Sequence, residues 1–174
     1  MGFGSVIATA ISIIVLLAAG YLLVGSITHS ADVTGSSIKA AADLDSRRIN
    51  TVLAIDGIGS SSAEGWFSFY LENTGSEKIA DIKQLDVIFK TAGLNDSVHY
   101  VPYGATGHPS VYWENDSITS LTAGIGDVVN PGMLDPGEYV NIRVHEEGGF
   151  PSNTAWVQVT APNGASVSSY IIIT

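Results

Sequence analysis

The residues of this chain that could do chemistry are few and widely spaced. Its four histidines form neither the H-x-H nor the H-E-x-x-H spacing that brings two imidazoles to one zinc ion. The absence of cysteine excludes thiolate metal sites, cysteine nucleophiles and disulfides. The neighbouring acids Glu146-Glu147 and Asp43-Leu44-Asp45 are typical of a solvated surface, because acid–base catalysis needs two carboxylates on opposite sides of a substrate. We therefore predict no enzyme, no cofactor and no metal site, although calcium binding in the Asp-, Asn- and Gly-rich stretch Asp127–Asp135 stays open.

Nucleotide and nucleic-acid chemistry are also excluded. The chain contains neither a G-x-S-x-G elbow nor a P-loop, and its Gly-Ile-Gly pairs lack the strand–turn–helix context of dinucleotide binding. Seventeen acids against seven bases give a net charge of −10. Phosphate backbones require clustered lysine and arginine, so no nucleic-acid partner is expected.

Two short features point instead to a surface role. The sequons Asn95-Asp96-Ser97 and Asn115-Asp116-Ser117 fall in predicted turns, so we predict glycosylation at Asn95 and Asn115, although a chain of this length often carries such motifs by chance. Four aromatic residues gather in the stretch that follows the third predicted strand: Tyr100, Tyr103, Tyr112 and Trp113. Exposed aromatics anchor protein interfaces, and buried ones build cores, and the sequence favours neither interpretation for these four.

The N-terminal part of the chain contains an apolar segment, Phe3–Ile27, which has no charged residue. Its 25 residues would span roughly 37 Å as a helix, against a hydrocarbon core of about 30 Å. The segment can therefore cross a membrane or form the helical core of a filament. It is too long for a signal peptide and nothing basic precedes it, so we expect no cleavage. The few basic residues after it mildly favour a cytoplasmic C-terminal part, but the very short flank before the span is the pattern of pilin-like proteins exported C-terminus out.

Small residues form a stripe on this predicted helix. Gly4, Ala8 and Ser12 follow each other at intervals of four, which lets helix backbones approach closely. The stripe predicts helix–helix association, although small residues are common in any membrane span. Thr28–Ser37 contains Gly35 and several Ser and Thr residues, so we expect a joint there, followed by a short amphipathic helix over Ser37–Asn50.

From Thr51 onward the hydrophobic period changes to two. The pattern predicts strands of alternating character with turns at Asn73–Ser76 and at Pro162-Asn163-Gly164, a β-hairpin signal. Short strands at this spacing are typical of a β-sandwich. We therefore divide the chain into a helical part, residues 1–50, and a β-sandwich, residues 51–174. The expected strands are Thr51–Ile58, Trp66–Asn73, Leu85–Lys90, Ser97–Tyr103, Ser110–Asn115, Glu138–Glu146, Thr154–Ala161 and Val167–Thr174.

The expected core follows the same alternation of apolar and polar residues. It consists of the larger apolar residues of four of these strands: Trp66, Phe67, Phe69, Leu71, Val87, Phe89, Val140, Ile142, Trp156 and Val159.

Several of these segments resemble archaellum (archaeal flagellum) accessory proteins of the FlaF family, and FlaG and some archaellins share parts of the layout. The resemblance rests on the start MGFGSVIATAISIIVLLAAG, the sequence SRRINTVLAIDGI, the strand–turn–strand FYLENTGSEKIADIKQLDVIF, and the later LDPGEYVNIRV and VTAPNGASVSSYII. It implies a mainly β fold, in which a pilin-like apolar helix precedes an immunoglobulin-like antiparallel β-sandwich. It further implies a place at the cell surface, self-association, and a stator role in which the sandwich holds the S-layer. The chain departs from the pattern by extra residues around Tyr100–Asn130.

Three functions compete at this point. The first is a non-enzymatic, stator-like anchor that links the archaellum to the cell envelope, with a single membrane span and the sandwich outside. The second is a pilin- or archaellin-like subunit that polymerises into an extracellular filament through its helix. The third, a membrane-anchored glycan-binding module or hydrolase, would need converging carboxylates or an aromatic platform, and the sequence shows neither clearly.

Overall fold

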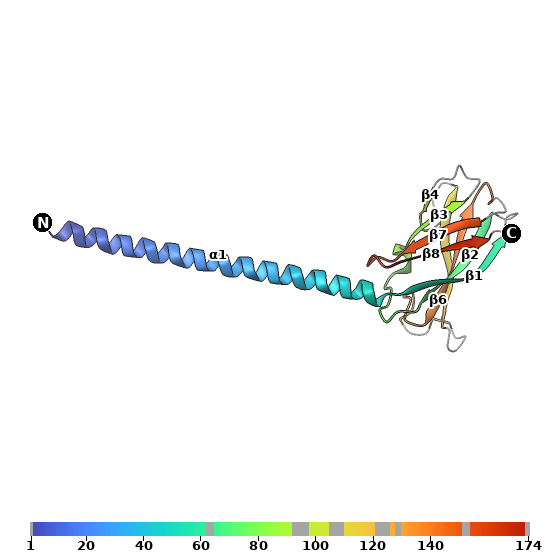
Figure 1. The fold of residues 1–174 in the computed structure, drawn as a ribbon, viewed down its shortest axis with the longest axis horizontal. Coiled ribbons are helices and arrows are strands. Elements are labelled where there is room, and N and C mark those ends of the chain that lie inside the picture. The colour runs from blue at the N-terminus through green and yellow to red at the C-terminus, as the bar shows by residue number, and fades with distance from the viewer. Residues whose placement is uncertain are drawn as a thin grey trace. The chain divides into compact units, whose positions relative to one another are not determined.

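A computed structural model describes residues 2–61, 65–91, 98–104, 110–120, 126–127, 130–150 and 154–172. The chain forms one helix, α1 (Phe3–Asn50), and then eight strands within the described residues (Figure 1). The strands are β1 (Leu53–Ser61), β2 (Trp66–Asn73), β3 (Asp86–Thr91), β4 (Val98–Val101), β5 (Val111–Ser120), β6 (Glu138–Glu146), β7 (Thr154–Thr160) and β8 (Ser166–Ile172). A short 3-10 helix, η1 (Ile82–Gln84), precedes β3.

Two compact units divide the chain, Met1–Asp45 and Ser46–Thr174. The last turn of α1 therefore belongs with the strands. We describe each unit by itself.

The first unit is helical throughout its described length, and the expected joint at Thr28–Ser37 is wrong. α1 continues through Gly35 without a break. A helical glycine costs only about 1 kcal/mol relative to alanine. The hydroxyls nearby also remain inside the helix: Thr34 donates to the carbonyl of Ser30 at 2.8 Å, and Ser36 and Ser37 donate to that of Val33 at 2.9 and 2.8 Å. Residues that often end helices here satisfy helical carbonyls instead.

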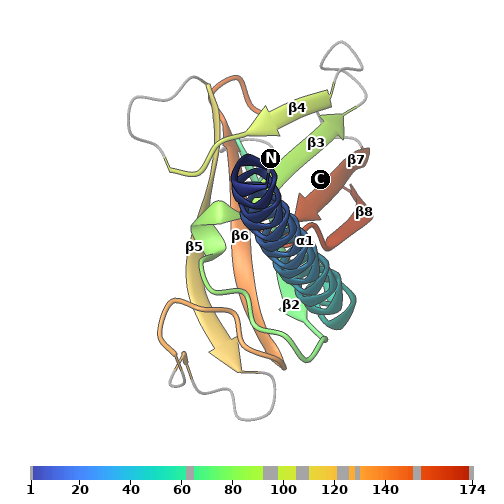
Figure 2. The same ribbon diagram turned by 90° about the vertical axis from the view of Figure 1, so that its left-hand side faces the viewer.

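The second unit is a β-sandwich of two four-stranded antiparallel sheets. One sheet has the order β1-β2-β6-β5 and the other β4-β3-β7-β8. Figure 2 shows the second sheet, and β2, β6 and β5 of the first. The predicted sandwich is thus confirmed. β2 lies between two partners, whereas β4, which is followed by Pro102, lies at an edge.

Alternate residues of the strands face the interior of the sandwich. Phe67 lies at the centre, with its ring centroid 5.9 Å from that of Phe89 and 4.8 Å from that of Phe150. Burying such a side chain stabilises the fold by about 1.5–3 kcal/mol. The largest fully buried side chains come from both sheets and the connections: Trp113, Phe67, Phe69, Phe89, Leu71, Leu134, Ile142, Ile171, Val87, Val101 and Val140.

Two expected core residues lie outside this interior. Trp66 and Trp156 are half-buried, because each precedes a residue, Phe67 or Val157, that faces inward. Neighbouring residues of a strand point to opposite faces, so each tryptophan must lie on the outer face of its sheet. The prediction that both tryptophans lie in the core was wrong because it rested only on their size and hydrophobicity.

Candidate functional site

The end of α1 is held by two turns of the sandwich, and we call this arrangement the helix clamp. It consists of residues 47–52, the turn 73–77 between β2 and η1, and the hairpin turn 161–165 between β7 and β8. All of these residues belong to the second unit.

The first turn of the clamp binds the backbone that leaves the helix. The amides of Ser76 and Glu77 donate to the carbonyl oxygen of Asn50 at 2.9 and 3.2 Å. Those of Thr74 and Gly75 donate to the carbonyl oxygen of Val52 at 2.9 and 3.1 Å. Carbonyls at a helix C-terminus lack helical partners, and here a turn supplies them.

Gly75 is required by this close approach. A Cβ atom at this position would lie 2.4 Å from the carbonyl oxygen of Asn50 and 2.5 Å from the amide nitrogen of Val52. Both neighbours are backbone atoms, so a side chain could be accommodated only by separating the turn from the helix end.

Asn73 fixes the shape of this turn from inside. Its side chain is fully buried and donates to the carbonyls of Glu77 at 2.8 Å and Leu134 at 3.0 Å. Its Oδ1 accepts the amide of Gly75 at 3.1 Å. An unsatisfied amide at a buried site would cost about 1–3 kcal/mol, so this set of bonds stabilises one turn conformation.

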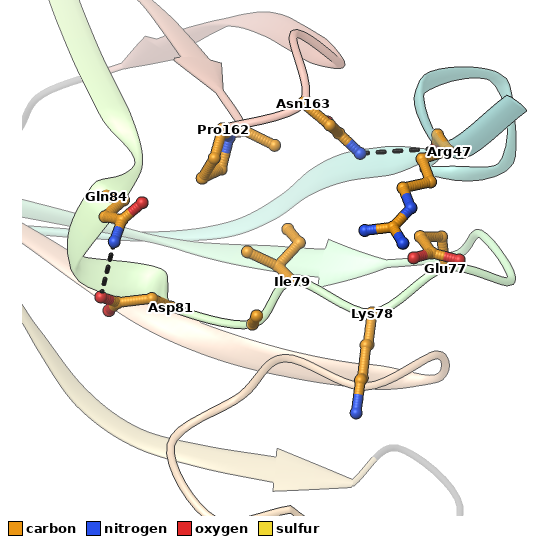
Figure 3. Close-up of a pocket in the computed structure, with 10 residues that line it drawn as sticks. Arg47, Glu77, Lys78, Ile79, Asp81, Gln84, Pro162 and Asn163 are labelled. Atoms are coloured by element: carbon orange, nitrogen blue, oxygen red, sulfur yellow. Dashed lines mark hydrogen bonds between the residues drawn. The ribbon is translucent and has the colours of Figure 1, made fainter. Parts of the chain in front are cut away.

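The second turn reaches the helix through a single side chain. Asn163 Nδ2 donates to Thr51 Oγ1 at 2.6 Å. It also lies 3.4 Å from the carbonyl oxygen of Arg47, the contact drawn as a dashed line in Figure 3. Thr51 in turn donates its hydroxyl to the carbonyl of Arg47 at 2.9 Å. The left-handed Gly164, with φ of 84°, completes the hairpin turn that the sequence predicted.

A cavity of about 210 Å³, lined by both apolar and polar residues, adjoins the clamp. Figure 3 shows its lining residues, including Arg47, Glu77, Lys78, Asp81 and Gln84. Both oxygens of the Asp81 carboxylate accept hydrogen bonds from η1, one from the Lys83 amide at 3.0 Å and one from Gln84 Nε2 at 3.1 Å. The described residues contain no group of three His, Asp or Glu side chains that could hold a metal ion.

A second feature lies on the outer face of β2, β6 and β5. The His145 ring stacks on Tyr112 with centroids 4.7 Å apart, and its Nε2 lies 2.8 Å from Glu114 Oε1. Arg143 lies 3.1 Å from Asp116 Oδ2, and its guanidinium sits 5.0 Å from the centre of the Trp66 ring. We call these six residues the outer-face network. Partly exposed ion pairs of this kind contribute little stability, about 0–1 kcal/mol each.

The comparison that decides the family is a sequence one. The sequence model of archaeal-type flagellins matches residues 2–171. The chain belongs to the archaeal-type flagellin family.

Two of the similar proteins cover nearly the whole length of the chain. An uncharacterized protein of Archaeoglobus fulgidus is 24% identical over 171 residues, which is 97% of this chain and 95% of that protein. The archaeal flagellum of Methanospirillum hungatei has a similar fold, with a TM-score of 0.65 over 97% of this chain and 93% of the other at 15% identity.

Solved stator proteins resemble the chain over a smaller part. The archaellum periplasmic stator protein FlaG of Sulfolobus acidocaldarius is 25% identical, with a TM-score of 0.51 over 70% of this chain and 99% of FlaG. The complex of FlaF and FlaG from that organism gives the same identity and TM-score over 68% of this chain and 87% of the other. The chain is therefore related to structural proteins of the archaellum, as the resemblance implied.

The four predicted interface aromatics of this flagellin-family chain are not brought together on one surface. Tyr100 on β4 is 63% exposed, whereas Trp113 on β5 is fully buried. Tyr103 is half-buried and meets Trp113 edge to face at 4.7 Å. Tyr112 alone joins the outer-face network. Of the two roles that the sequence left open, core or interface, Trp113 therefore has the core role. An interface role for Tyr100, Tyr103 and Tyr112 stays a prediction.

The predicted glycosylation sites have different outcomes. Asn95 lies outside the described residues. Asn115 lies within β5 rather than in the predicted turn, next to a register shift between Asn115 and Ile118. Its Oδ1 accepts the Tyr103 hydroxyl at 3.0 Å, and its Nδ2 donates to the Asp116 carbonyl at 2.9 Å. The sequence placed the end of this strand at Asn115, but β5 continues past the register shift to Ser120. Glycosylation of Asn95 and Asn115 stays a prediction.

The small-residue stripe is exposed along α1. Gly4, Ala8 and Ser12 are all exposed, and the Ser12 hydroxyl returns to the Ala8 carbonyl at 2.9 Å. Among the described residues α1 is the one helix that is long and apolar enough to cross a membrane by length and composition. The stripe is therefore open to another helix.

Sequence reasoning missed both the clamp and the outer-face network. From the sequence, Asn73, Gly75 and Asn163 were identified only as turn residues. Their roles in holding the helix end became visible only in the structure. Trp66, Arg143 and His145 occupy alternate positions on the outer side of β2 and β6, so the period of two could have placed them on one face.

Proposed function

We propose that the chain is a non-enzymatic, membrane-anchored accessory protein of the archaellum that acts as a stator-like anchor to the cell envelope. In this proposal α1 crosses the membrane once, the sandwich lies outside, and the envelope partner is the S-layer. The observation that carries the proposal is the 25% identity to FlaG, a periplasmic stator protein, over 99% of the FlaG structure.

The clamp supports an anchoring role. An anchor needs a durable connection between its mount and its binding domain, and needs no catalytic group. For such a connection it matters that the helix end is held at several places. Here the carbonyls of Arg47, Asn50 and Val52 are bound by two separate turns as well as by the chain itself. A pull on the last helical turn is therefore shared among β1 and both turns rather than borne by one extended segment.

A filament subunit is the second candidate, and a specific observation favours it. The fold similarity to the Methanospirillum hungatei flagellum extends over 97% of this chain, which includes the helical part. In that function α1 would pack with α1 helices of other copies, and their apolar surfaces would exclude water as lipid does.

Electron microscopy of the full-length protein, released gently from cells that make it, separates the two. Discrete particles that remain with membrane or envelope fragments support the anchor. Long filaments built mainly of this chain would overturn it in favour of the filament subunit. The matched pair Ala8→Leu and Ala10→Leu sharpens the result, because residues two apart on a helix lie about 200° around its axis. Filaments that are lost in Ala8→Leu but kept in Ala10→Leu would show packing through the stripe.

A further inference from the structure

The outer faces of the two sheets differ in character. The outer face of β2, β6 and β5 holds ion pairs, such as that between Arg143 and Asp116. The sheet β4-β3-β7-β8, whose strands lie side by side in Figure 1, has a different set of outward residues. Phe89 on β3 and Val157 on β7 are fully buried, so the residues next to them in each strand point outward. The pairing of the strands then shows which outward side chains are neighbours.

The strand register places three aromatic residues on this face. Trp156 on β7 lies directly opposite Tyr170 on β8, and residues opposite each other have Cβ atoms about 4.5–5.5 Å apart. Tyr100 on β4 lies opposite Ile88 on β3, which lies opposite Gln158 on β7. Strands are about 4.8 Å apart and rise about 3.4 Å per residue, so Tyr100 lies roughly 12 Å from Trp156 across the face.

These rings are accessible to a ligand. Tyr170 is 73% exposed and Tyr100 is 63% exposed, whereas Trp156 is half-buried. The described pairings of β3 with β4, β3 with β7 and β7 with β8 contain no register shift, so the face is regular. An extended ligand could therefore lie across several strands.

Polar side chains without net charge accompany the rings. The outward charged residues on the described part of this sheet are Asp86 and Lys90, and their charges cancel in a chain of net charge −10. The other outward polar residues of β7 and β8 carry an amide or a hydroxyl: Gln158, Thr154, Thr160, Ser166 and Ser168. The exposed aliphatic residues of the face, Val98 and Ile172, lie on its two edge strands.

This combination matches the chemistry of a sugar. The face of an aromatic ring is partly negative and attracts the weakly positive C–H groups of a ligand. A pyranose ring has C–H groups on its faces and hydroxyls around its edge, so rings beside amides and hydroxyls complement it. Nucleic acids and anionic membranes require a positive surface. Protein interfaces are depleted in lysine and serine, whereas Lys90, Ser166 and Ser168 lie on this face.

We propose that the outer face of β4-β3-β7-β8 binds a neutral glycan chain, whose sugar rings stack on Trp156, Tyr170 and Tyr100. Trp156 and Tyr170 would hold one part of the chain, and Tyr100 would hold a sugar ring farther along it. A glycan-binding module needs an aromatic platform, which the sequence did not show clearly and which the strand register provides. The inference goes beyond the proposed function, because it applies equally to an anchor and to a filament subunit.

Electrophoresis of the full chain in detergent, through native gels that contain a neutral polysaccharide, tests the proposal. The probes are mannan, laminarin and hydroxyethyl cellulose, and at least one of them should retard the unaltered chain. Tyr170→Ala and Tyr100→Ala should each weaken this binding by about tenfold, because each removes one stacking ring. Both residues are exposed, so neither change should disturb the fold.

The matched control is Tyr70→Ala on the outer face of the other sheet. Tyr70 is 42% exposed and lies on β2, so its replacement should leave the retardation unchanged. Equal losses in Tyr170→Ala and Tyr70→Ala would overturn the proposal, and so would the absence of retardation by all three polysaccharides.

The length of the glycan supplies an independent measurement. Because the rings lie on strands at both sides of the face, a polysaccharide should bind at least about tenfold more tightly than its single sugar, compared per sugar residue. Equal binding of mannan and free mannose would refute a platform that spans the sheet. If Tyr170→Ala leaves polysaccharide binding unchanged but abolishes association with a protein, the face is a protein contact and the proposal is wrong.

Discussion

The two units of the chain treat their apolar residues in opposite ways. In the sandwich Phe67, Phe69 and Phe89 are fully buried against one another, whereas no residue of α1 is buried, and Leu16 and Leu22 are each 71% exposed. A run of apolar surface that long is not stable in water. The sandwich is therefore complete as a folded unit, while α1 requires lipid or neighbouring helices. The sandwich thus buries its own apolar side chains, whereas those of α1 can be buried only by molecules around the chain.

The largest effect is expected from the buried aromatic core. Trp113→Ala should destabilise the sandwich by about 3–5 kcal/mol, because it removes a fully buried indole and leaves a cavity. Denaturant unfolding followed by near-ultraviolet circular dichroism measures the loss. Tyr100→Ala, at an exposed position, should change the free energy of unfolding by less than about 0.5 kcal/mol. Equal effects of the two changes would contradict the core position of Trp113.

The clamp should be the next most sensitive place. Gly75→Ala forces a Cβ against two backbone atoms of residues 50 and 52, so we expect a loss of about 2 kcal/mol or more. Gly148→Ala is the matched control, because a Cβ there meets nothing within 4 Å and should cost less than about 0.5 kcal/mol. Thermal unfolding of both variants decides whether the turn is pressed against the helix end.

A smaller effect is expected for the second turn of the clamp. Asn163→Ala removes the bond to Thr51 Oγ1 and should cost about 1 kcal/mol. The double variant with Thr51→Val tests whether this loss comes from the pair. Its effect should be less than the sum of the two single effects by about 0.5 kcal/mol or more, and strict additivity would show that the two side chains act independently.

The helix should respond to a change that leaves the sandwich untouched. Ala8→Leu obstructs the small-residue stripe and should weaken association between α1 helices, whereas Ala10→Leu should not. Dimerisation measured by energy transfer between labelled chains in vesicles checks this. The free energy of unfolding of the sandwich should stay within about 0.5 kcal/mol in both variants, because Ala8 and Ala10 lie in the first unit.

The smallest effect concerns Glu146 at the end of β6. Burial raises the pKa of this carboxyl above its ordinary value of 4.5, and the nearby His99 partly opposes the shift. The folded state then holds the proton more tightly than the unfolded state, so this group's stabilising contribution is present below pH 4.5 and is lost as the pH rises through the raised pKa. Glu146→Gln should flatten the dependence of unfolding free energy on pH in that window. An unchanged slope would assign the dependence to other groups.

Much of the sandwich could be predicted because its strands repeat simple patterns. β2 and β6 begin and end where the sequence placed them, at Trp66–Asn73 and Glu138–Glu146. Apolar residues occupy every second position over most of both strands, as Phe67, Phe69 and Leu71 do in β2, and glycine- or asparagine-containing turns lie beside them. The faces of Trp66 and Trp156 were mispredicted because both are large and apolar, although their inward-facing neighbours already determined the opposite orientation.

By itself the sequence determined the local properties. These are an uncharged helical segment, Phe3–Ile27, that is long enough to cross a membrane, strands with a hydrophobic period of two, and turns at Asn73–Ser76 and Pro162–Gly164. These depend on residues close together in the chain. Only the tertiary structure decided that Trp113 lies in the core, that Gly75 and Asn163 meet the same helix end, and that β8 ends its sheet. Each of these depends on contacts between segments far apart in sequence, which no local pattern specifies.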